Sequence, residues 1–257
     1  LLLLSALLIF ACSSDDSSNN NSNIELLNSN GEIVPTIVYG TQQWSVENAD
    51  YTVYTDGTPI PQVTDDNEWV NLTTGAWCYY DNDPNKDKLY NWYAVVGIHD
   101  DDPNTPNKEF ASEGWHVPSD SEWSILVEYM IANGYNYDGS SYSCYPCPQE
   151  YNKIAQAVAS TTGWISSTQV GSPGYDQSLN NSSGFNALPG GLRIGASWDT
   201  SGDLFAYEGL IGCIWSSSGY SGINTAWGVS LGQESDHFDG WGFYKKDGYF
   251  VRLIREE

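Results

Sequence analysis

The sequence predicts an α+β domain with two main helices, short antiparallel strands and long loops. A capped amphipathic helix is expected after Ser119 and a second helix after Pro148. From about residue 185 onward, short apolar segments alternate with Gly-rich turns, which is typical of strands. Because 257 residues can bury a sizeable core and no second polar linker interrupts them, we expect one domain over residues 30–257.

The first helix carries the clearest local signal in the chain. Ser119 is the expected N-cap, and Glu122 three residues later completes a capping box. The apolar residues that follow recur at helical spacing and form one stripe. They are Trp123, Leu126, Val127, Met130 and Ile131.

The other elements are expected from apolar runs between turn residues. After Pro148, a helical face would include Tyr151, Ile154, Ala155 and Val158. Residues 89–96 fit either a strand or a short helix, and residues 56–61 and 64–69 read as loops. Lys246-Asp247-Gly248 predicts a hairpin turn into a terminal strand. The expected strands cover residues 33–39, 42–46, 76–80, 185–193, 204–207, 214–217, 226–231, 241–244 and 249–255.

Charge and composition limit the classes of partner. The chain has 33 acidic and 9 basic residues, a net charge of −24. Binding to nucleic acid or to an anionic lipid surface requires clustered Lys and Arg, so both are excluded as partners. Its 11 Trp and 18 Tyr, among many Asn, Ser and Gly residues, are typical of a secreted β-rich protein.

The N-terminus resembles a bacterial lipoprotein signal. An apolar run too short to span a bilayer ends in Ile9-Phe10-Ala11-Cys12, where Cys12 would be lipidated. Without an initiator Met or a basic segment, residues 1–11 read as an N-terminally truncated signal peptide. Residues 12–29 then form an acidic, Ser- and Asn-rich tether. The expected location is the outer membrane of a Gram-negative bacterium, where the protein would be lipid-anchored at the cell surface. The alternative to a lipoprotein signal is that the N-terminal apolar run is a short buried segment followed by a linker.

Four cysteines remain after Cys12. In an oxidising compartment Cys78, Cys144, Cys147 and Cys213 are candidates for disulfides, with three possible connectivities. Alternatively, Cys144 and Cys147 form a redox or half-zinc motif, but no second Cys-x-x-Cys and no nearby His supports zinc. Structural bridging is the preferred interpretation.

A series of motifs resembles the Fibrobacter succinogenes major paralogous domain, a family of extracytoplasmic lipoprotein modules. The motifs cover about residues 30–257 in one order and include Gly114-Trp115-His116-Val117-Pro118-Ser119-Asp120, Leu89-Tyr90-Asn91-Trp92-Tyr93, Phe185-Asn186-Ala187-Leu188-Pro189-Gly190-Gly191, Trp215-Ser216-Ser217-Ser218 and Val251-Arg252. The resemblance implies a fold like that of C-type lectins and of the formylglycine-generating enzyme group.

The chain departs from the family pattern at two positions. Where relatives usually carry a Cys before Gly-Trp-His and another after Val-Arg, this sequence has Ala111 and Leu253. The resemblance implies that these family cysteines form a disulfide that this chain lacks. Cys144 and Cys147 lie in a loop longer than is usual for the family. They would form a disulfide with each other within this insertion, or one of them would form a disulfide with Cys78 or Cys213.

Two groups of residues are candidates for binding. The loop from Asp81 to Asp87 alternates oxygen ligands as a calcium loop does, but Lys86 and Trp92 occupy places where such a loop needs Gly and Glu. Its candidate Ca²⁺ ligands are Asp81, Asp83, Asn85 and Asp87. Loop tryptophans have flat faces that suit sugar rings. They are Trp69, Trp77, Trp198, Trp227 and Trp241, and each has core packing as its alternative.

These features favour a surface-anchored lipoprotein that binds glycan or protein ligands through a lectin-like module. The membrane would be contacted only through the lipid, and Ca²⁺ is the one cofactor considered. His99, His116 and His237 lie far apart without a nucleophile partner, and His116 is expected to bond within the fold. Cys213 lacks the sequence context of a formylglycine-generating site. An enzyme of that group, a carbohydrate hydrolase or a structural envelope protein remain the alternatives.

Overall fold

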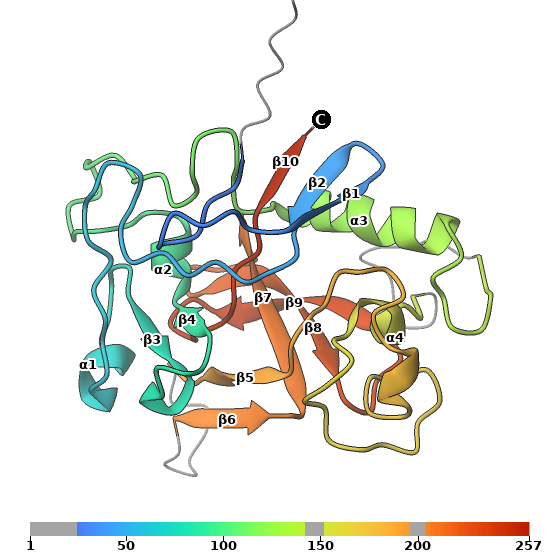
Figure 1. Ribbon diagram of the computed structural model, residues 1–257. Coiled ribbons are helices and arrows are strands. Elements are labelled where there is room, and N and C mark those ends of the chain that lie inside the picture. The colour runs from blue at the N-terminus through green and yellow to red at the C-terminus, as the bar shows by residue number, and fades with distance from the viewer. Residues whose placement is uncertain (1–24, 142–151, 196–203, 257) are drawn as a thin grey trace, which may run out of the picture.

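A computed structural model describes residues 25–141, 152–195 and 204–256 (Figure 1). Most of its regular structure is strand. The strands are β1 (Thr36–Tyr39), β2 (Gln42–Ser45), β3 (Trp77–Tyr79), β4 (Lys88–Tyr90), β5 (Gly190–Arg193), β6 (Phe205–Glu208), β7 (Ile211–Gly219), β8 (Thr225–Gly232), β9 (Phe238–Tyr244) and β10 (Ile254–Glu256). They form a curled sheet in the order β6-β5-β7-β8-β9, a three-stranded sheet β1-β2-β10 and the pair β3-β4.

The helices are few and mostly one turn long. They are α1 (Asp66–Val70), α2 (Trp92–Val95), α3 (Asp120–Ala132) and α4 (Ala155–Val158), with 3₁₀ turns η1 (Tyr80–Asn82) and η2 (Gln177–Leu179). The apolar segment 89–96, expected as strand or helix, contains the end of β4 and all of α2. Asn91 lies between them and caps α2, because its side chain accepts a hydrogen bond from the Ala94 N–H at 3.0 Å.

The predicted α+β, C-type lectin-like fold with two main helices is wrong. Strands make up 28% and helices 15% of the described residues, among which α3 is the one long helix. The expected second helix is reduced to the four residues of α4, all of which are buried. The helix ends at Ala159, whose extended backbone (φ −69°, ψ 148°) bridges to Ala187 instead of continuing the helical turn.

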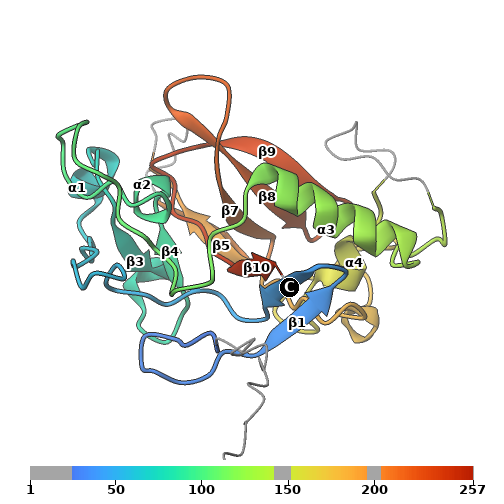
Figure 2. The same ribbon diagram turned by 90° about the horizontal axis from the view of Figure 1, so that it is seen from above.

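The expected first helix is confirmed as α3. The Ser119 hydroxyl accepts from the Glu122 N–H at 3.3 Å, and a Glu122 carboxylate oxygen accepts from the Ser119 N–H at 2.7 Å, completing the capping box. All five residues of the apolar stripe are buried. α3 lies over β7 and β8 and beside β1, as Figure 2 shows from above.

The two ends of the domain meet in one sheet. β2 lies between β1 and β10, and its Trp44 is paired with both Ile37 and Ile254. The indole of Trp44 is fully buried, with its ring centroid 4.6 Å from that of Trp123 on α3. This aromatic contact joins the three-stranded sheet to the helix above the main sheet.

Two hydrophobic clusters form the core. One surrounds α3 and includes Trp44, Trp123 and Phe185. The other lies around Trp215, whose indole N–H donates to the Tyr90 carbonyl at 2.7 Å and whose ring lies 4.7 Å from that of Tyr249. The second cluster therefore fastens β3-β4 to the five-stranded sheet.

The N-terminal predictions lie mostly outside the described residues, including the signal peptide, Cys12 and the tether as far as residue 24. Leu26, assigned to the end of the tether, is instead buried, and Leu27 bridges to Ile33. Among residues 25–141, 152–195 and 204–256, no helix has the length and apolar character needed to cross a bilayer.

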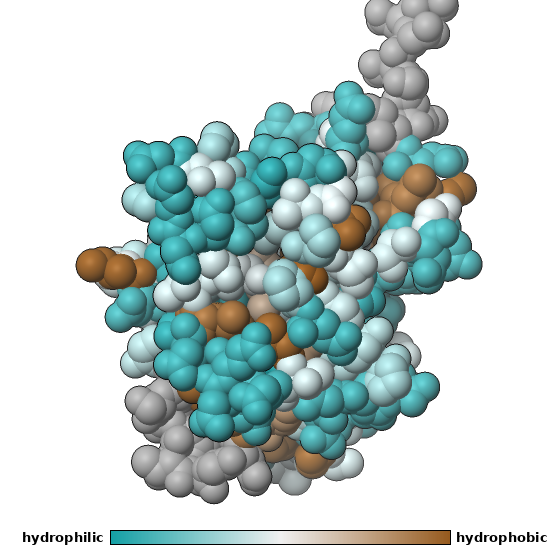
Figure 3. All heavy atoms as spheres, turned by 90° about the vertical axis from the view of Figure 1, so that its left-hand side faces the viewer, coloured by the Kyte–Doolittle hydropathy of each residue, from teal (hydrophilic) through white to brown (hydrophobic). Residues whose placement is uncertain are grey.

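The surface reflects the acidic, polar composition. Figure 3 shows the face that carries α1 and its neighbouring loops, which is mainly hydrophilic with only small hydrophobic spots. Isolated apolar spots of this size are ordinary on a folded protein and do not indicate a broad apolar interface.

Candidate functional site

A cavity of about 280 Å³ lies between the loop after β3, the segment before β5 and strand β6. We call it the Tyr80 cavity. Its apolar lining comes from aromatic and aliphatic side chains, and its polar lining from charged, amide and hydroxyl groups. The lining residues are Tyr80, Asn85, Lys86, Asp87, Thr162, Gly163, Leu188, Pro189, Gly190, Glu208 and Phe250.

Tyr80 is positioned by an abrupt turn after β3. The next two residues, Asp81 and Asn82, have φ angles of 51° and 54°, a left-handed conformation that Asp and Asn tolerate better than most residues. The Tyr80 ring meets Phe205 of β6 edge-on, with centroids 5.4 Å apart. Burial raises the pKa of the Tyr80 phenol, so the hydroxyl remains protonated at neutral pH.

The rim of the Tyr80 cavity is charged. Lys86 and Glu208 form an ion pair, with their side chains 42% and 44% exposed. This pair raises the pKa of Lys86. Glu208 lies opposite Gly190 in the β5-β6 pair, so the sheet register brings it to this rim. The Glu208 side chain has further lone pairs with which it can accept hydrogen bonds from a ligand.

The cavity combines an apolar wall with donors and acceptors. Phe250 is 2% exposed and lines the cavity together with Pro189, so both present apolar surface that belongs to the core. Lys86 and Thr162 supply donors, and Glu208 and Asp87 supply acceptors. A concave site with this mixture suits a small ligand that has both an apolar face and hydroxyl groups.

The fold is that of a sheet-rich domain, and the Tyr80 cavity is lined by no residue of its main helix, α3. Residues 37–255 match the Fibrobacter succinogenes major domain, and the chain belongs to that family. No curated protein matches the chain. No solved structure matches it either.

Two of the candidate calcium ligands, Asn85 and Asp87, line the Tyr80 cavity, and the carboxylates of Asp83 and Asp87 already accept hydrogen bonds from protein groups. Asp83 accepts hydrogen bonds from the backbone and side-chain nitrogens of Asn85 at 2.9 and 2.8 Å. Asp87 accepts from the Asn48 amide at 2.8 Å. In the described part of the chain, no group of three or more His, Cys, Asp or Glu side chains is arranged to hold a metal ion. Calcium binding by Asp81, Asp83, Asn85 and Asp87 stays a prediction.

The candidate tryptophans are not brought together. Trp69 is fully buried, and its indole N–H donates to the Lys246 carbonyl at 2.8 Å, while Trp77 is 6% exposed. Trp227 is half-buried and meets Tyr220 edge-on at 4.5 Å. Trp241 on β9 is 50% exposed. Trp198 lies outside the described residues.

Cys78 and Cys213 are buried free thiols. Burial raises the pKa of Cys78 to about 11 and that of Cys213 still further, so neither is a reactive thiolate at neutral pH. Cys144 and Cys147 lie outside the described residues, and a bridge between them stays a prediction. Ala111 and Leu253, where relatives carry cysteines, are both buried in the cluster around Trp215.

His116 bonds within the fold as expected. Its Nε2 lies 2.5 Å from Glu122 Oε1, and this hydrogen bond raises the pKa of the imidazole. His99 lies 3.5 Å from Asp100 in a separate loop.

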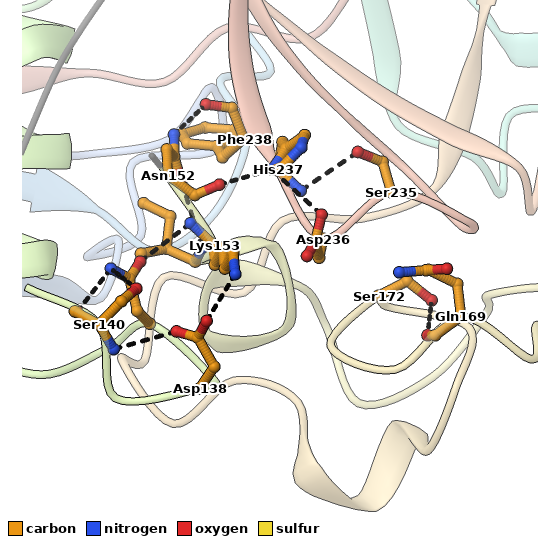
Figure 4. A network of polar contacts seen from close by, with 12 residues as sticks. Asp138, Ser140, Asn152, Lys153, Gln169, Ser172, Ser235, Asp236, His237 and Phe238 are labelled. Carbon is orange, nitrogen blue, oxygen red and sulfur yellow. Dashed lines mark hydrogen bonds and ion pairs between the residues drawn. The ribbon is translucent and has the colours of Figure 1, made fainter. Parts of the chain in front are cut away.

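His237 belongs to a structural network (Figure 4). Its Nδ1 lies 2.6 Å from the Asn152 carbonyl and 3.1 Å from an Asp236 carboxylate oxygen. Asn152 donates to the Phe238 carbonyl at 2.5 Å, and the neighbouring Lys153 pairs with Asp138 at 2.5 Å. The network holds the turn before β9 against residues 152–153, and its groups are occupied by protein partners.

Sequence reasoning missed Tyr80, Thr162 and Glu208. They lie 46 to 128 residues apart in the chain, and the fold brings them to one cavity. The pairing of β5 with β6 places Glu208 there, opposite Gly190. The usable local signal was the pair of Asx residues after Tyr80, which marks a tight turn but does not identify its partner.

Proposed function

We propose that this protein is a surface lipoprotein, lipidated on Cys12, that binds a carbohydrate in the Tyr80 cavity. A sugar ring has an apolar C–H face and a hydroxyl edge. One observation carries the proposal: the cavity sets the Tyr80 ring and the apolar side chains of Leu188 and Pro189 beside the Lys86–Glu208 pair. The ring would stack on the sugar face, and the charged pair would donate to and accept from its hydroxyls.

Binding rather than hydrolysis is favoured by the contacts of the carboxylates. Glu208 is paired with Lys86, and Asp87 accepts a hydrogen bond from Asn48. Hydrolysis requires two carboxyl groups that flank the scissile bond and take part in the reaction, whereas both carboxyl groups here are already engaged by protein groups. Each has remaining lone pairs that can accept a hydrogen bond from a sugar hydroxyl.

The test is binding of the full chain to an array of neutral oligosaccharides, followed by calorimetry on each glycan retained. Tyr80→Ala and Glu208→Gln should each weaken binding by about tenfold, the loss expected for a ring contact or a charged hydrogen bond. Tyr175→Ala is the matched control, since Tyr175 is 46% exposed and does not line the cavity. No glycan retained, or equal losses in all three variants, would overturn the proposal.

The lipid anchor is tested separately. Palmitate labelling in a Gram-negative host should be lost in Cys12→Ala and kept in Cys78→Ala. Protease shaving of intact cells should release the domain if it lies on the outer face of the outer membrane. Labelling that persists without Cys12 would contradict the anchor but leave the carbohydrate site untouched.

A further inference from the structure

A second cavity of about 280 Å³ lies over the five-stranded sheet and is assigned no role above. We call it the Tyr249 cavity. Strand β6 contributes to both cavities, with Glu208 in the first and Tyr207 in the second. Four aromatic rings, one carboxylate and several aliphatic groups line it. The lining residues are Leu192, Tyr207, Ile211, Cys213, Gly242, Phe243, Tyr244, Asp247 and Tyr249.

The aromatic wall is held in place by the core. Tyr249 is 2% exposed and meets Phe243 edge-on, with centroids 4.9 Å apart. Both rings also pack on Trp215, which is fully buried beneath them. Tyr207 and Tyr244 are 44% and 42% exposed. The inner two rings are therefore fixed, and the outer two are in contact with solvent.

Asp247 places a buried carboxylate in this aromatic wall. It is 2% exposed, one oxygen accepts from the Gly195 N–H at 2.8 Å, and the other accepts from the Tyr249 hydroxyl at 3.0 Å. Both carboxyl oxygens therefore have protein donors, which fix the orientation of the group in the wall. Burial raises the pKa of Tyr249 well above its usual value, so the phenol stays a donor.

Tyr207 adopts a strained backbone beside this cavity. Its φ is 65°, which is rare for a bulky residue, and it faces Gly191, whose φ is 67°. The β5-β6 register pairs Gly190 with Glu208 and Leu192 with Ala206, and a Cβ on Gly191 would lie 2.5 Å from the Ala206 carbonyl. Such strain persists where the surrounding structure holds it, and it is concentrated at binding and active sites.

We propose that the Tyr249 cavity binds a small organic cation of the alkylammonium class, enclosed by the four aromatic rings and facing Asp247. Aromatic faces attract ammonium groups through the ring quadrupole, and cages of several rings select quaternary ammonium ions. The carboxylate supplies a counter-charge close to the cation. The net charge of −24 adds a long-range attraction for cations.

Cys213 does not make this a covalent site. The thiol is fully buried, and burial with the nearby Asp247 charge keeps its pKa far above neutral. In this cavity it is a small apolar wall group, and the proposed binding is reversible.

The proposal is tested by calorimetry of the full chain with choline and with tetramethylammonium. The neutral isostere of choline, 3,3-dimethyl-1-butanol, is the control ligand. Binding of both cations without the alcohol is expected. No binding of either cation, or equal binding of the alcohol, would overturn the proposal.

Two variants separate the cage from the fold. Tyr244→Leu and Tyr207→Leu remove one ring each at partly exposed positions and should weaken choline binding by about fivefold. Tyr175→Leu should leave it unchanged. Asp247→Asn should weaken it more, provided its circular dichroism is that of the parent. Unchanged affinity for choline in both tyrosine variants would contradict the proposal that the aromatic rings enclose the cation.

Two binding experiments distinguish a soluble cation from a lipid headgroup. The first arm uses free choline, and the second arm uses vesicles of phosphatidylcholine. Choline binding without vesicle binding indicates a soluble ligand, whereas both together indicate a lipid headgroup. Glu208→Gln, which acts on the Tyr80 cavity, should not change either arm, so this proposal and the carbohydrate proposal can fail independently.

Discussion

Arg252 donates a hydrogen bond from Nη2 to the backbone carbonyl of Asn186 at 2.9 Å, joining two of the family motifs across 66 residues of chain. The same guanidinium bonds to the Ser45 carbonyl and to the Asn48 side chain, at 2.9 and 2.8 Å. Arg252 is fully buried, and its burial lowers its pKa to about 10, so it remains charged at neutral pH. One buried cation therefore fixes three segments.

Replacing this cation should be costly. Arg252→Met would leave three acceptors without their donor, which predicts a loss of about 3 kcal/mol or more in the free energy of unfolding. Urea denaturation followed by tryptophan fluorescence measures it. The matched control is Arg255→Met, on a half-buried residue that bonds to Gln43 at 2.5 Å. The free energy of unfolding of Arg255→Met should fall by about 1 kcal/mol or less. Similar losses in both variants would contradict the stabilising role given to Arg252.

His116 should give stability a pH dependence of defined sign. Its folded pKa is raised above the ordinary 6.5 by Glu122, so the stabilisation is complete below the unfolded pKa and is lost as pH rises through the folded one. Since the side chain is 47% exposed, the effect should be small, about 0.5 kcal/mol.

Comparing the parent chain with His116→Gln at about pH 5.5 and about pH 9 tests this sign. The parent should be the more stable at the lower pH, and the two should converge at the higher one. A difference that grows with pH would show that the sign is wrong.

Calcium should not stabilise the loop after β3. Asp83 already accepts two hydrogen bonds from Asn85, which lower the pKa of its carboxyl, and Lys86 places an ammonium group in the loop. We expect the melting temperature to be the same in excess Ca²⁺ and in chelator. A rise with Ca²⁺ that Asp83→Asn abolishes would instead establish the loop as a calcium site.

Cys78 should resist alkylation in the native protein. It is fully buried, and its raised pKa disfavours the thiolate that reacts. Iodoacetamide at about pH 8, followed by peptide mass spectrometry, should label it only after denaturation. Recovery of Cys78 in a disulfide with Cys144 or Cys147 would contradict the free thiol.

Gly97 should be irreplaceable. Its φ is 75°, and a Cβ there would lie 1.9 Å from the Lys108 carbonyl oxygen. Gly97→Ala should therefore cost more than about 2 kcal/mol. Gly57→Ala is the matched control, because φ is 85° but nothing lies within 4 Å of the added atom. It should cost about 1 kcal/mol, the price of the left-handed backbone alone.

The sequence predicted best where local signals were complete. α3 carries its own cap and a full apolar stripe, so its start and buried face were both predicted correctly. Prediction failed at α4, where the chain extends at Ala159 to bridge with the distant Ala187, and at α1, where Asp65 caps a short helix in a segment expected to be a loop. Most strands were found, but β5 and β10 begin five residues later than expected. The hairpin expected at Lys246-Asp247-Gly248 is wrong, because β10 pairs with β2 and not with β9.

The sites were beyond local reasoning. Trp69 on α1 is fully buried, whereas Trp241 on β9 is half exposed. Which of them faces solvent depends on what packs against each element, and that is set by distant parts of the chain. Glu208 and Tyr207 reach their cavities because β6 pairs with β5, and Tyr80 reaches its cavity through the turn after β3.

The placement of β2 between β1 and β10 has a consequence for folding during synthesis. Trp44 cannot pair with Ile254 until that residue, 210 positions later, has been made. Until then β2 is paired on one side only, by β1. The three-stranded sheet therefore closes late, after nearly all of the domain has been synthesised.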